Sequence, residues 1–237
     1  MNRSLRRVLA ALAAVLLLCV VGFGIYVGDY YRADDAALSI SAAARTEGQF
    51  TTLPAADGGT QVGVVFYPGA KVQAAAYLPL LRQLADRGVT CVLVEMPFNL
   101  AFFGMNAAQD AMALHPQVEQ WYLMGHSLGG AMACSYAADH PDEVAGLVLL
   151  GAYVYGEIPA EKALVLYGEQ DLVLSREKLA GGANEVVIPG GNHAWFGNYG
   201  TQNGDGEAAI TREEQQAVTV QYALQFMGLA GAAQPAA

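Results

Sequence analysis

Short runs of branched apolar residues alternate with helical segments along most of the chain, and this order constrains the fold more than any other feature. Strands are expected at residues 62–67, 89–95, 121–124, 144–150, 163–167 and 185–188, and helices at 77–87, 106–114, 128–138 and 212–227. Strands that are apolar on both faces are typical of parallel sheets with helices on each side. The sequence therefore predicts an α/β fold with a mostly parallel sheet sandwiched by helices.

The motif Gly125-His126-Ser127-Leu128-Gly129-Gly130 lies directly between a predicted strand and a predicted helix. In a G-x-S-x-G of this kind the tight turn strains the serine backbone and directs its hydroxyl out of the carboxyl edge of the sheet. Gly125 and Gly129 flank Ser127 because a Cβ at either position would crowd the turn. Ser127 is therefore the candidate nucleophile, and an incidental serine in a glycine-rich turn is the alternative.

A serine hydroxyl needs a base to accept its proton and a third group to orient that base. Asp171 and His193 each follow a predicted strand, in the order Ser, acid, His. Because the carboxyl ends of parallel strands share one edge, we expect the three groups to meet there. Glu169 competes with Asp171 for the role of the acid. The alternatives are that Asp171 is a turn or helix-cap residue and that His193 is an exposed loop histidine. His126 adjoins the serine, but the turn directs its side chain elsewhere.

Together these residues resemble the α/β-hydrolase superfamily, specifically its small, capless bacterial group related to dienelactone hydrolase. The similarity runs from about Val62 to Met227, with landmarks at residues 67–71 (YPGAK), 125–130, 168–171 and 191–193. The resemblance implies an α/β-hydrolase fold with Ser127 as nucleophile and His193 as general base and then general acid. Asp171 would be the acid that orients the histidine.

The resemblance also implies an oxyanion hole of two backbone N–H groups, one of them from Leu128. By position the second donor is Ala70, with Lys71 as the neighbouring alternative. This loop departs from the more familiar His-Gly motif of the family, because Pro68 occupies the place of that histidine. Many relatives insert a helical cap after residue 150. Only 12 residues precede the next predicted strand, so we expect no cap domain and an open cleft.

Residues 8–28 form an uncharged run of 21 residues preceded by three arginines and followed by aspartates. A helix of about 1.5 Å per residue and this length crosses a hydrocarbon core of roughly 30 Å. The positive-inside rule then leaves the N-terminus in the cytoplasm and the rest outside it. We expect an uncleaved, single-pass anchor in the cell membrane (1–28), a polar stalk (29–45) and an extracytoplasmic hydrolase domain (46–230). A cleaved signal peptide is the alternative.

Charge and cysteine content exclude several classes of function. The 22 acidic residues outnumber 12 basic ones and give a net charge of −10, which argues against nucleic acid as a partner. Three cysteines are too few for a disulfide framework, and their spacing matches no zinc motif. We therefore expect neither a metal nor another cofactor.

Two loops bear on the substrate. The loop after Glu95 is apolar and contains Phe98, Phe102 and Phe103; it could line an acyl pocket, touch lipid or simply pack on the domain. Residues 203–206 (NGDG) are interpreted as a turn rather than a calcium loop. Candidates for aromatic walls of the cleft are Tyr153, Tyr155, Trp195, Phe196 and Tyr199.

The leading hypothesis is a serine hydrolase, of carboxylesterase or lipase type, that forms an acyl-enzyme on Ser127. Its partner would be a small-molecule or lipid-like acyl ester. An acyltransferase with the same triad is one alternative. A catalytically inactive binding module tethered to the envelope is another.

Overall fold

The computed structural model describes residues 2–59, 61–179, 181 and 184–229 of the chain. The chain divides into two units, residues 1–30 and 31–237, and each is described by itself. The first unit contains helix α1 (Arg3–Gly28). This helix has 26 residues and contains an 18-residue stretch with a mean hydropathy of 2.9, so its length and composition allow it to cross a membrane, as those of a signal sequence also would.

The second unit is built on one sheet, which has eight strands in the part of the chain that the structure describes. Their order is β1-β2-β4-β3-β5-β6-β7-β8. The strands are β1 (Arg45–Glu47), β2 (Phe50–Leu53), β3 (Val62–Tyr67), β4 (Thr90–Val94), β5 (Gln120–His126), β6 (Gly146–Leu150), β7 (Ala163–Gly168) and β8 (Glu185–Ile188). All pairings among β3 to β8 are parallel, whereas β1 and β2 extend the sheet with antiparallel pairings.

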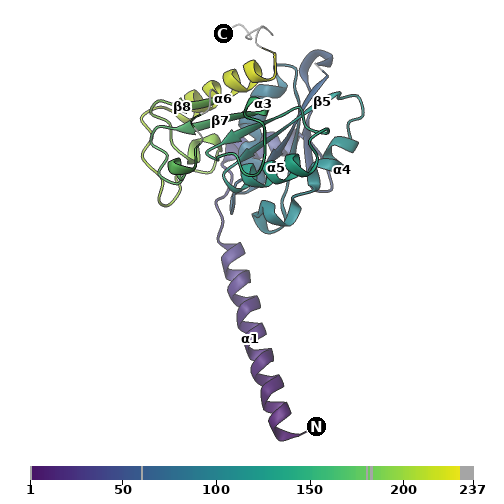
Figure 1. Cartoon of the computed structure of the whole chain (residues 1–237), viewed down its shortest axis with the longest axis vertical. Coiled ribbons are helices and arrows are strands. Elements are labelled where there is room, and N and C mark those ends of the chain that lie inside the picture. Colours follow the sequence, from purple (N-terminus) through teal and green to yellow (C-terminus); the bar gives the residue numbers. More distant parts are fainter. Residues whose placement is uncertain (1, 60, 180, 182–183, 230–237) are drawn as a thin grey trace. The chain divides into compact units, whose positions relative to one another are not determined.

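Helices cover both faces of this sheet (Figure 1). They are α2 (Asp35–Ala43), α3 (Leu78–Ala85), α4 (Ala107–Ala113), α5 (Leu128–Asp139) and α6 (Arg212–Phe226). Val64 of β3 packs in one apolar core with Leu81 of α3, whereas the next residue, Val65, packs in a second core with Ala133 of α5. Successive side chains of a strand point to opposite faces, and here both faces are buried. The predicted helix-sheet-helix sandwich is confirmed.

The connection between β6 and β7 spans residues 151–162. Its regular structure is one short 3-10 turn, Ala160–Lys162. This confirms the prediction that the domain has no cap, because many relatives place theirs in this connection.

The segment before β1 belongs to the second unit. Helix α2 begins after Asp34, whose Oδ1 accepts a hydrogen bond from the Ala37 N–H at 3.0 Å. Ala37 is fully buried. The other oxygen, Oδ2, accepts from Arg212 of α6 at 2.7 Å and from Asn198 at 2.9 Å. These contacts tie the segment to loops and helices more than 160 positions away in the sequence.

The predicted stalk at residues 29–45 is therefore wrong from Tyr31 onward, where the compact unit begins. A nine-residue helix with a single buried alanine leaves no apolar pattern in the sequence, and its polar contacts depend on distant residues. The predicted end of the domain, residue 230, lies outside the described residues.

Candidate active site

Ser127 lies at the turn between β5 and α5 with φ 52° and ψ −121°. This backbone conformation is strained for a non-glycine residue and is typical of serine nucleophiles on such turns. A Cβ at Gly129 would lie 2.1 Å from the Tyr67 carbonyl oxygen, and one at Gly125 would lie 2.6 Å from the Gly129 backbone. Both glycines are thus required by backbone packing around the serine, as the motif predicts.

The imidazole of His193 is held from one side by Asp171. Its Nδ1 lies 2.8 Å from Asp171 Oδ2, and both side chains are almost completely buried. Asp171 Oδ1 accepts from the backbone N–H groups of Val173 (2.9 Å) and Leu174 (2.8 Å). An acceptor at Asp171 Oδ2 selects the tautomer of a neutral imidazole that carries its hydrogen on Nδ1 and its lone pair on Nε2. Within the described residues, this buried Nε2 has no hydrogen-bond partner.

Ser127 and His193 lie on the wall of one cavity of about 300 Å³. Its lining comprises Ser127, Leu128, Ala131, Gly151, Ala152, Tyr153, Val173, Leu174, Ser175 and His193. Gly151 leaves room for the imidazole, since a Cβ there would lie 2.8 Å from His193 Nδ1. The fold thus brings together three side chains that are far apart in the sequence, with Asp171 bonded to the imidazole that borders the cavity.

Glu169, the competitor for the role of acid, has a different partner. Its Oε2 accepts a hydrogen bond from the Gly190 N–H at 2.9 Å. Glu169 therefore fixes the turn that precedes His193, and the structure places Asp171 against the imidazole.

The two expected oxyanion donors occupy adjacent segments. Leu128 is the first residue of α5, where backbone N–H groups have no partner within the helix. After β3, the Lys71 N–H donates to the Asn99 carbonyl at 2.8 Å and the Gly69 N–H donates to Tyr77 Oη at 3.1 Å. The Ala70 N–H between them has no acceptor in the part of the chain that the structure describes. Of the two alternatives, Ala70 thus has the available N–H.

His126 connects this loop to His193. The sequence did not reveal this connection. His126 Nε2 lies 3.0 Å from the His193 carbonyl oxygen, which only accepts, so Nε2 carries the hydrogen. Its Nδ1 then accepts from Tyr77 Oη at 2.7 Å, and the same hydroxyl accepts from Gly69. Burial, and next the proximity of His193, lowers the pKa of His126 well below its usual value, which keeps the ring neutral.

Comparisons with known proteins identify the family of this chain. A family model described as the alpha/beta hydrolase family matches residues 63–217. The chain belongs to the α/β-hydrolase family. Its family is therefore one of hydrolases.

Solved structures similar to this α/β hydrolase cover most of its length. One is a monoacylglycerol lipase from Paleococcus ferrophilus, with a TM-score of 0.57 and 15% identity over 76% of this chain and 100% of that one. A second is Est1E from Butyrivibrio proteoclasticus, with a TM-score of 0.53 and 14% identity over 78% and 98%. A third, from Xanthomonas campestris, is described as an α/β serine hydrolase without a lid; its TM-score is 0.53, with 16% identity over 78% and 90%. At these identities the likeness shows the fold alone.

A curated relative matches over a shorter stretch. A protein of Mycobacterium phage D29 that is named as a non-heme haloperoxidase is 30% identical over 103 residues. The match covers 40% of this α/β hydrolase and 37% of the phage protein. The chain thus aligns with little more than a third of that relative.

Asp205 also positions the histidine of this α/β hydrolase. Its Oδ1 accepts from the His193 N–H at 3.1 Å and its Oδ2 accepts from the Ala194 N–H at 2.8 Å. The sequence showed only a turn at residues 203–206. An acidic residue between two glycines was the available signal, but nothing local indicates which backbone it holds.

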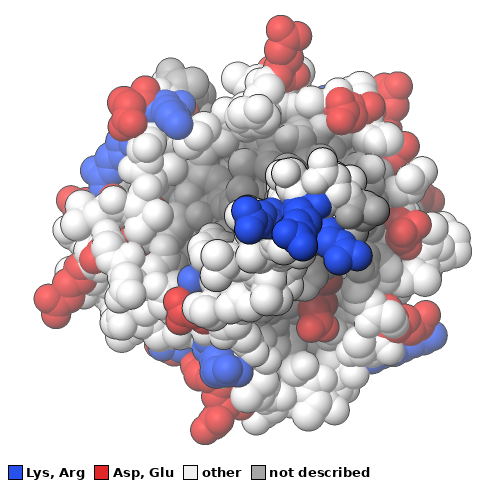
Figure 2. All heavy atoms as spheres, turned by 90° about the horizontal axis from the view of Figure 1, so that it is seen from below, with Lys and Arg blue, Asp and Glu red and all other residues white. Residues whose placement is uncertain are grey.

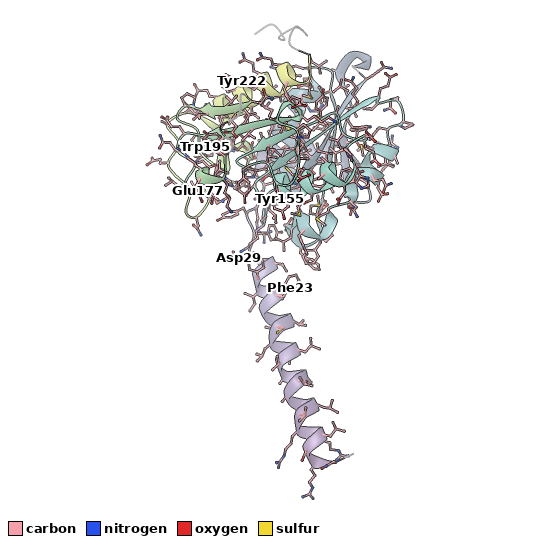
Figure 3. The ribbon with its side chains drawn as sticks, viewed as in Figure 1. Phe23, Asp29, Tyr155, Glu177, Trp195 and Tyr222 are labelled. Atoms are coloured by element: carbon pink, nitrogen blue, oxygen red, sulfur yellow. The ribbon has the colours of Figure 1, made fainter. Side chains whose placement is uncertain are left out.

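One of the five aromatic candidates lines the cavity, namely Tyr153. Phe196 and Tyr199 are buried in the apolar core, and Trp195 lines a separate cavity beside Asn192. Tyr155 is 56% exposed to solvent (Figure 3). Sequence position near a strand end was thus a poor guide to which aromatic ring faces the cleft.

Proposed function

We propose that this α/β hydrolase cleaves carboxylic esters through an acyl-enzyme on Ser127. The observation that supports this best is the state of His193. Its Nδ1 is fixed by Asp171, while its Nε2 is buried without a partner among the described residues, beside a cavity that Ser127 also lines. A neutral imidazole in this tautomer is suited to accept the serine proton.

In the proposed reaction, Ser127 Oγ attacks the ester carbonyl carbon and passes its proton to His193 Nε2. The carbonyl oxygen becomes an oxyanion that accepts hydrogen bonds from the N–H groups of Leu128 and Ala70. The tetrahedral intermediate then expels the alcohol, which takes the proton from Nε2. Water repeats the sequence on the acyl-enzyme and releases the acid. The loss of one oxyanion donor typically costs about 10²- to 10³-fold in rate.

We also propose that α1 is an uncleaved membrane anchor, with the catalytic domain outside the cytoplasm. Its 26 residues span about 39 Å at 1.5 Å per residue, enough to cross a hydrocarbon core of about 30 Å. The arginines in its first two turns and the aspartates after it favour this orientation. An enzyme anchored at the outer surface of the membrane lies next to lipid-like acyl esters. The intact mass of protein extracted from membranes should include residues 1–28, and a mass without them would show cleavage.

Labelling with a fluorophosphonate probe tests the catalytic proposal on the full chain in detergent. Wild-type protein should be labelled, and Ser127→Ala should lose the label together with at least about 10³-fold in ester hydrolysis. Ser135→Ala is the matched control, because Ser135 lies on α5, the helix that follows Ser127, and its hydroxyl donates to the Ala131 carbonyl. Equal labelling of Ser127→Ala and wild type would refute the assignment.

A further inference from the structure

We propose that residues 97–104, here called the aromatic loop, dock the catalytic domain onto the bilayer that holds α1, so that the site takes acyl esters embedded in that bilayer. The proposal deepens the proposed function and rests on it for the anchor and for the ester chemistry. The occupant of this surface is lipid acyl chains, rather than a protein or a second copy of the chain.

Three phenylalanines make the aromatic loop apolar and exposed. Phe98, Phe102 and Phe103 are 52%, 61% and 48% exposed. Their rings gather edge to face, with Phe103 at 5.5 Å from each of the other two between ring centroids. Phe98 also adopts a left-handed backbone, with φ 59° and ψ 19°, which a bulky residue rarely does. Exposed apolar clusters of this kind mark surfaces that contact a membrane or a partner.

The aromatic loop lies at the catalytic edge of the sheet. It follows the carboxyl end of β4, which runs parallel to β3. Within it, the Asn99 carbonyl accepts the Lys71 N–H at 2.8 Å, one residue after Ala70. The exposed phenylalanines and the proposed oxyanion donor therefore belong to two loops that are hydrogen-bonded to each other.

The chain joins the second unit at the same place. The Tyr31 N–H donates to the Lys71 carbonyl at 2.7 Å, and the Tyr31 carbonyl accepts from the Gln73 N–H at 2.9 Å. Only two residues separate Tyr31 from Gly28, the end of α1. At no more than about 3.6 Å per residue, they hold Tyr31 within about 11 Å of Gly28 whatever the angle between the units. A membrane anchor thus keeps the catalytic edge close to the bilayer.

Charge favours insertion of apolar groups over attraction to lipid headgroups. Residues 96–109 contain no charged side chain, and from residue 29 onward nine Lys and Arg face 22 Asp and Glu. Figure 2 shows acidic side chains scattered around one face of the molecule rather than gathered in a patch. An acidic domain is repelled by anionic lipids, so the uncharged aromatic loop is its suitable contact. Acyl chains are the occupant that matches this composition.

Quenching by lipid tests docking without reference to catalysis. Two variants of the full chain, Phe102→Trp and the control Tyr222→Trp, are each reconstituted in phosphatidylcholine vesicles with brominated acyl chains. Tyr222 is 37% exposed but borders a cavity at the amino ends of β7 and β8, on the opposite side of the domain from Tyr155 in Figure 3. After subtraction of wild-type emission, the fluorescence of the indole introduced by Phe102→Trp should be quenched at least about twofold. The fluorescence of the indole in the control should not be quenched. Equal emission of both variants in brominated and ordinary vesicles would overturn docking.

Substrate choice gives a second test. The expected result for Phe102→Ser/Phe103→Ser is a fall of about tenfold in the ratio of p-nitrophenyl palmitate hydrolysis in vesicles to p-nitrophenyl acetate hydrolysis in water. A tenfold change corresponds to about 1.4 kcal/mol, less than the burial of one phenylalanine side chain. Tyr222→Ser should leave the ratio unchanged. An unchanged ratio in the double serine variant would contradict the proposal.

The two tests separate the docking proposal from the proposed function. Ser127→Ala combined with Phe102→Trp should keep the quenching while it abolishes hydrolysis. Hydrolysis of the soluble ester without quenching would reject docking and leave the hydrolase intact. Quenching with no hydrolysis by any variant would reject the hydrolase and leave docking intact. Cross-linking between copies through the aromatic loop, with no quenching, would assign the surface to a second copy and overturn the proposal.

Discussion

The segments that carry Ser127 and His193 are held in place by different forces. Around Ser127 the constraint is steric, because backbone atoms of neighbouring turns fill the space that side chains at Gly125 and Gly129 would need. Around His193 the constraint is polar, since Asp205 and His126 bind its backbone N–H and carbonyl. The glycines that mark the first segment lie within a few residues of Ser127, although the atoms that crowd Gly129 belong to Tyr67 and Pro68. The residues that hold the second segment lie 12 and 67 positions away from His193.

The largest expected effect is at the steric site. A Cβ at Gly129 would meet the backbone oxygens of Tyr67 (2.1 Å) and Pro68 (2.4 Å), which cannot rotate away. We expect Gly129→Ala to lower the free energy of unfolding by about 3 kcal/mol or more, or to prevent folding. Denaturant unfolding of the full chain in detergent measures this.

Gly200→Ala is the control for that substitution. Gly200 has φ 83° but open space around the position of a Cβ, so backbone strain alone should cost about 1–2 kcal/mol. If both variants lost equal stability, crowding would not be what fixes the serine turn.

A smaller effect is expected at the polar site. Asp205→Asn keeps the shape but offers one acceptor oxygen where two are used, so either the His193 N–H or the Ala194 N–H faces an amide donor. We expect kcat for ester hydrolysis to fall about 10- to 100-fold, because the base is misplaced, with KM changing less. Asn203→Ala, in the same loop with an exposed side chain, should retain activity. A normal kcat in Asp205→Asn would show that the loop is held by other contacts.

The smallest effect concerns pH. The folded-state pKa of His126 lies below its usual value of 6.5, so below about pH 6.5 the unfolded chain binds a proton that the folded chain does not. The free energy of unfolding therefore decreases on acidification by up to about 1.4 kcal/mol per pH unit from this group. His126→Gln should remove that part of the slope in unfolding experiments from pH 7 to 5.

Tyr77→Phe is the matched variant for the pH experiment. It removes the hydroxyl that donates to His126 Nδ1 but keeps the titrating ring. Its free energy of unfolding should fall by about 1–3 kcal/mol, since buried groups lose a partner. The dependence of that free energy on pH should remain steeper than in His126→Gln. Identical slopes in wild type and His126→Gln would count against a neutral, buried His126.

These two regions also differ in how well the sequence predicts them. The parallel strands and the serine turn were predictable, because apolar runs and closely spaced glycines are local signals. Even so, β5 proved longer than the predicted 121–124 and continues through His126. The strands β1 and β2 were not predicted, since one has three exposed residues and the other has four residues without a clear alternation. Short edge strands take their structure from the neighbour they pair with.

The sequence did not predict the residues that hold the histidine and the loop after β3 in position. Tyr77 and Asp205 lie in segments with ordinary helix and turn patterns, and their partners are Gly69, His126 and the backbone of His193. Such contacts exist only once the sheet has assembled, so no local pattern records them. The choice of Asp171 over Glu169 is similar, because only one residue, Gln170, lies between the candidates and only the folded loop decides which one meets the imidazole.

The short connection between β6 and β7 has a kinetic consequence. A site without a cap has no covering segment that must open, so exchange of ligands with solvent does not wait for such a segment to move. The same openness gives little protection from bulk solvent, where water at high concentration outcompetes a scarce acceptor alcohol. Architecture of this kind suits turnover limited by bond chemistry, and it favours hydrolysis over transfer.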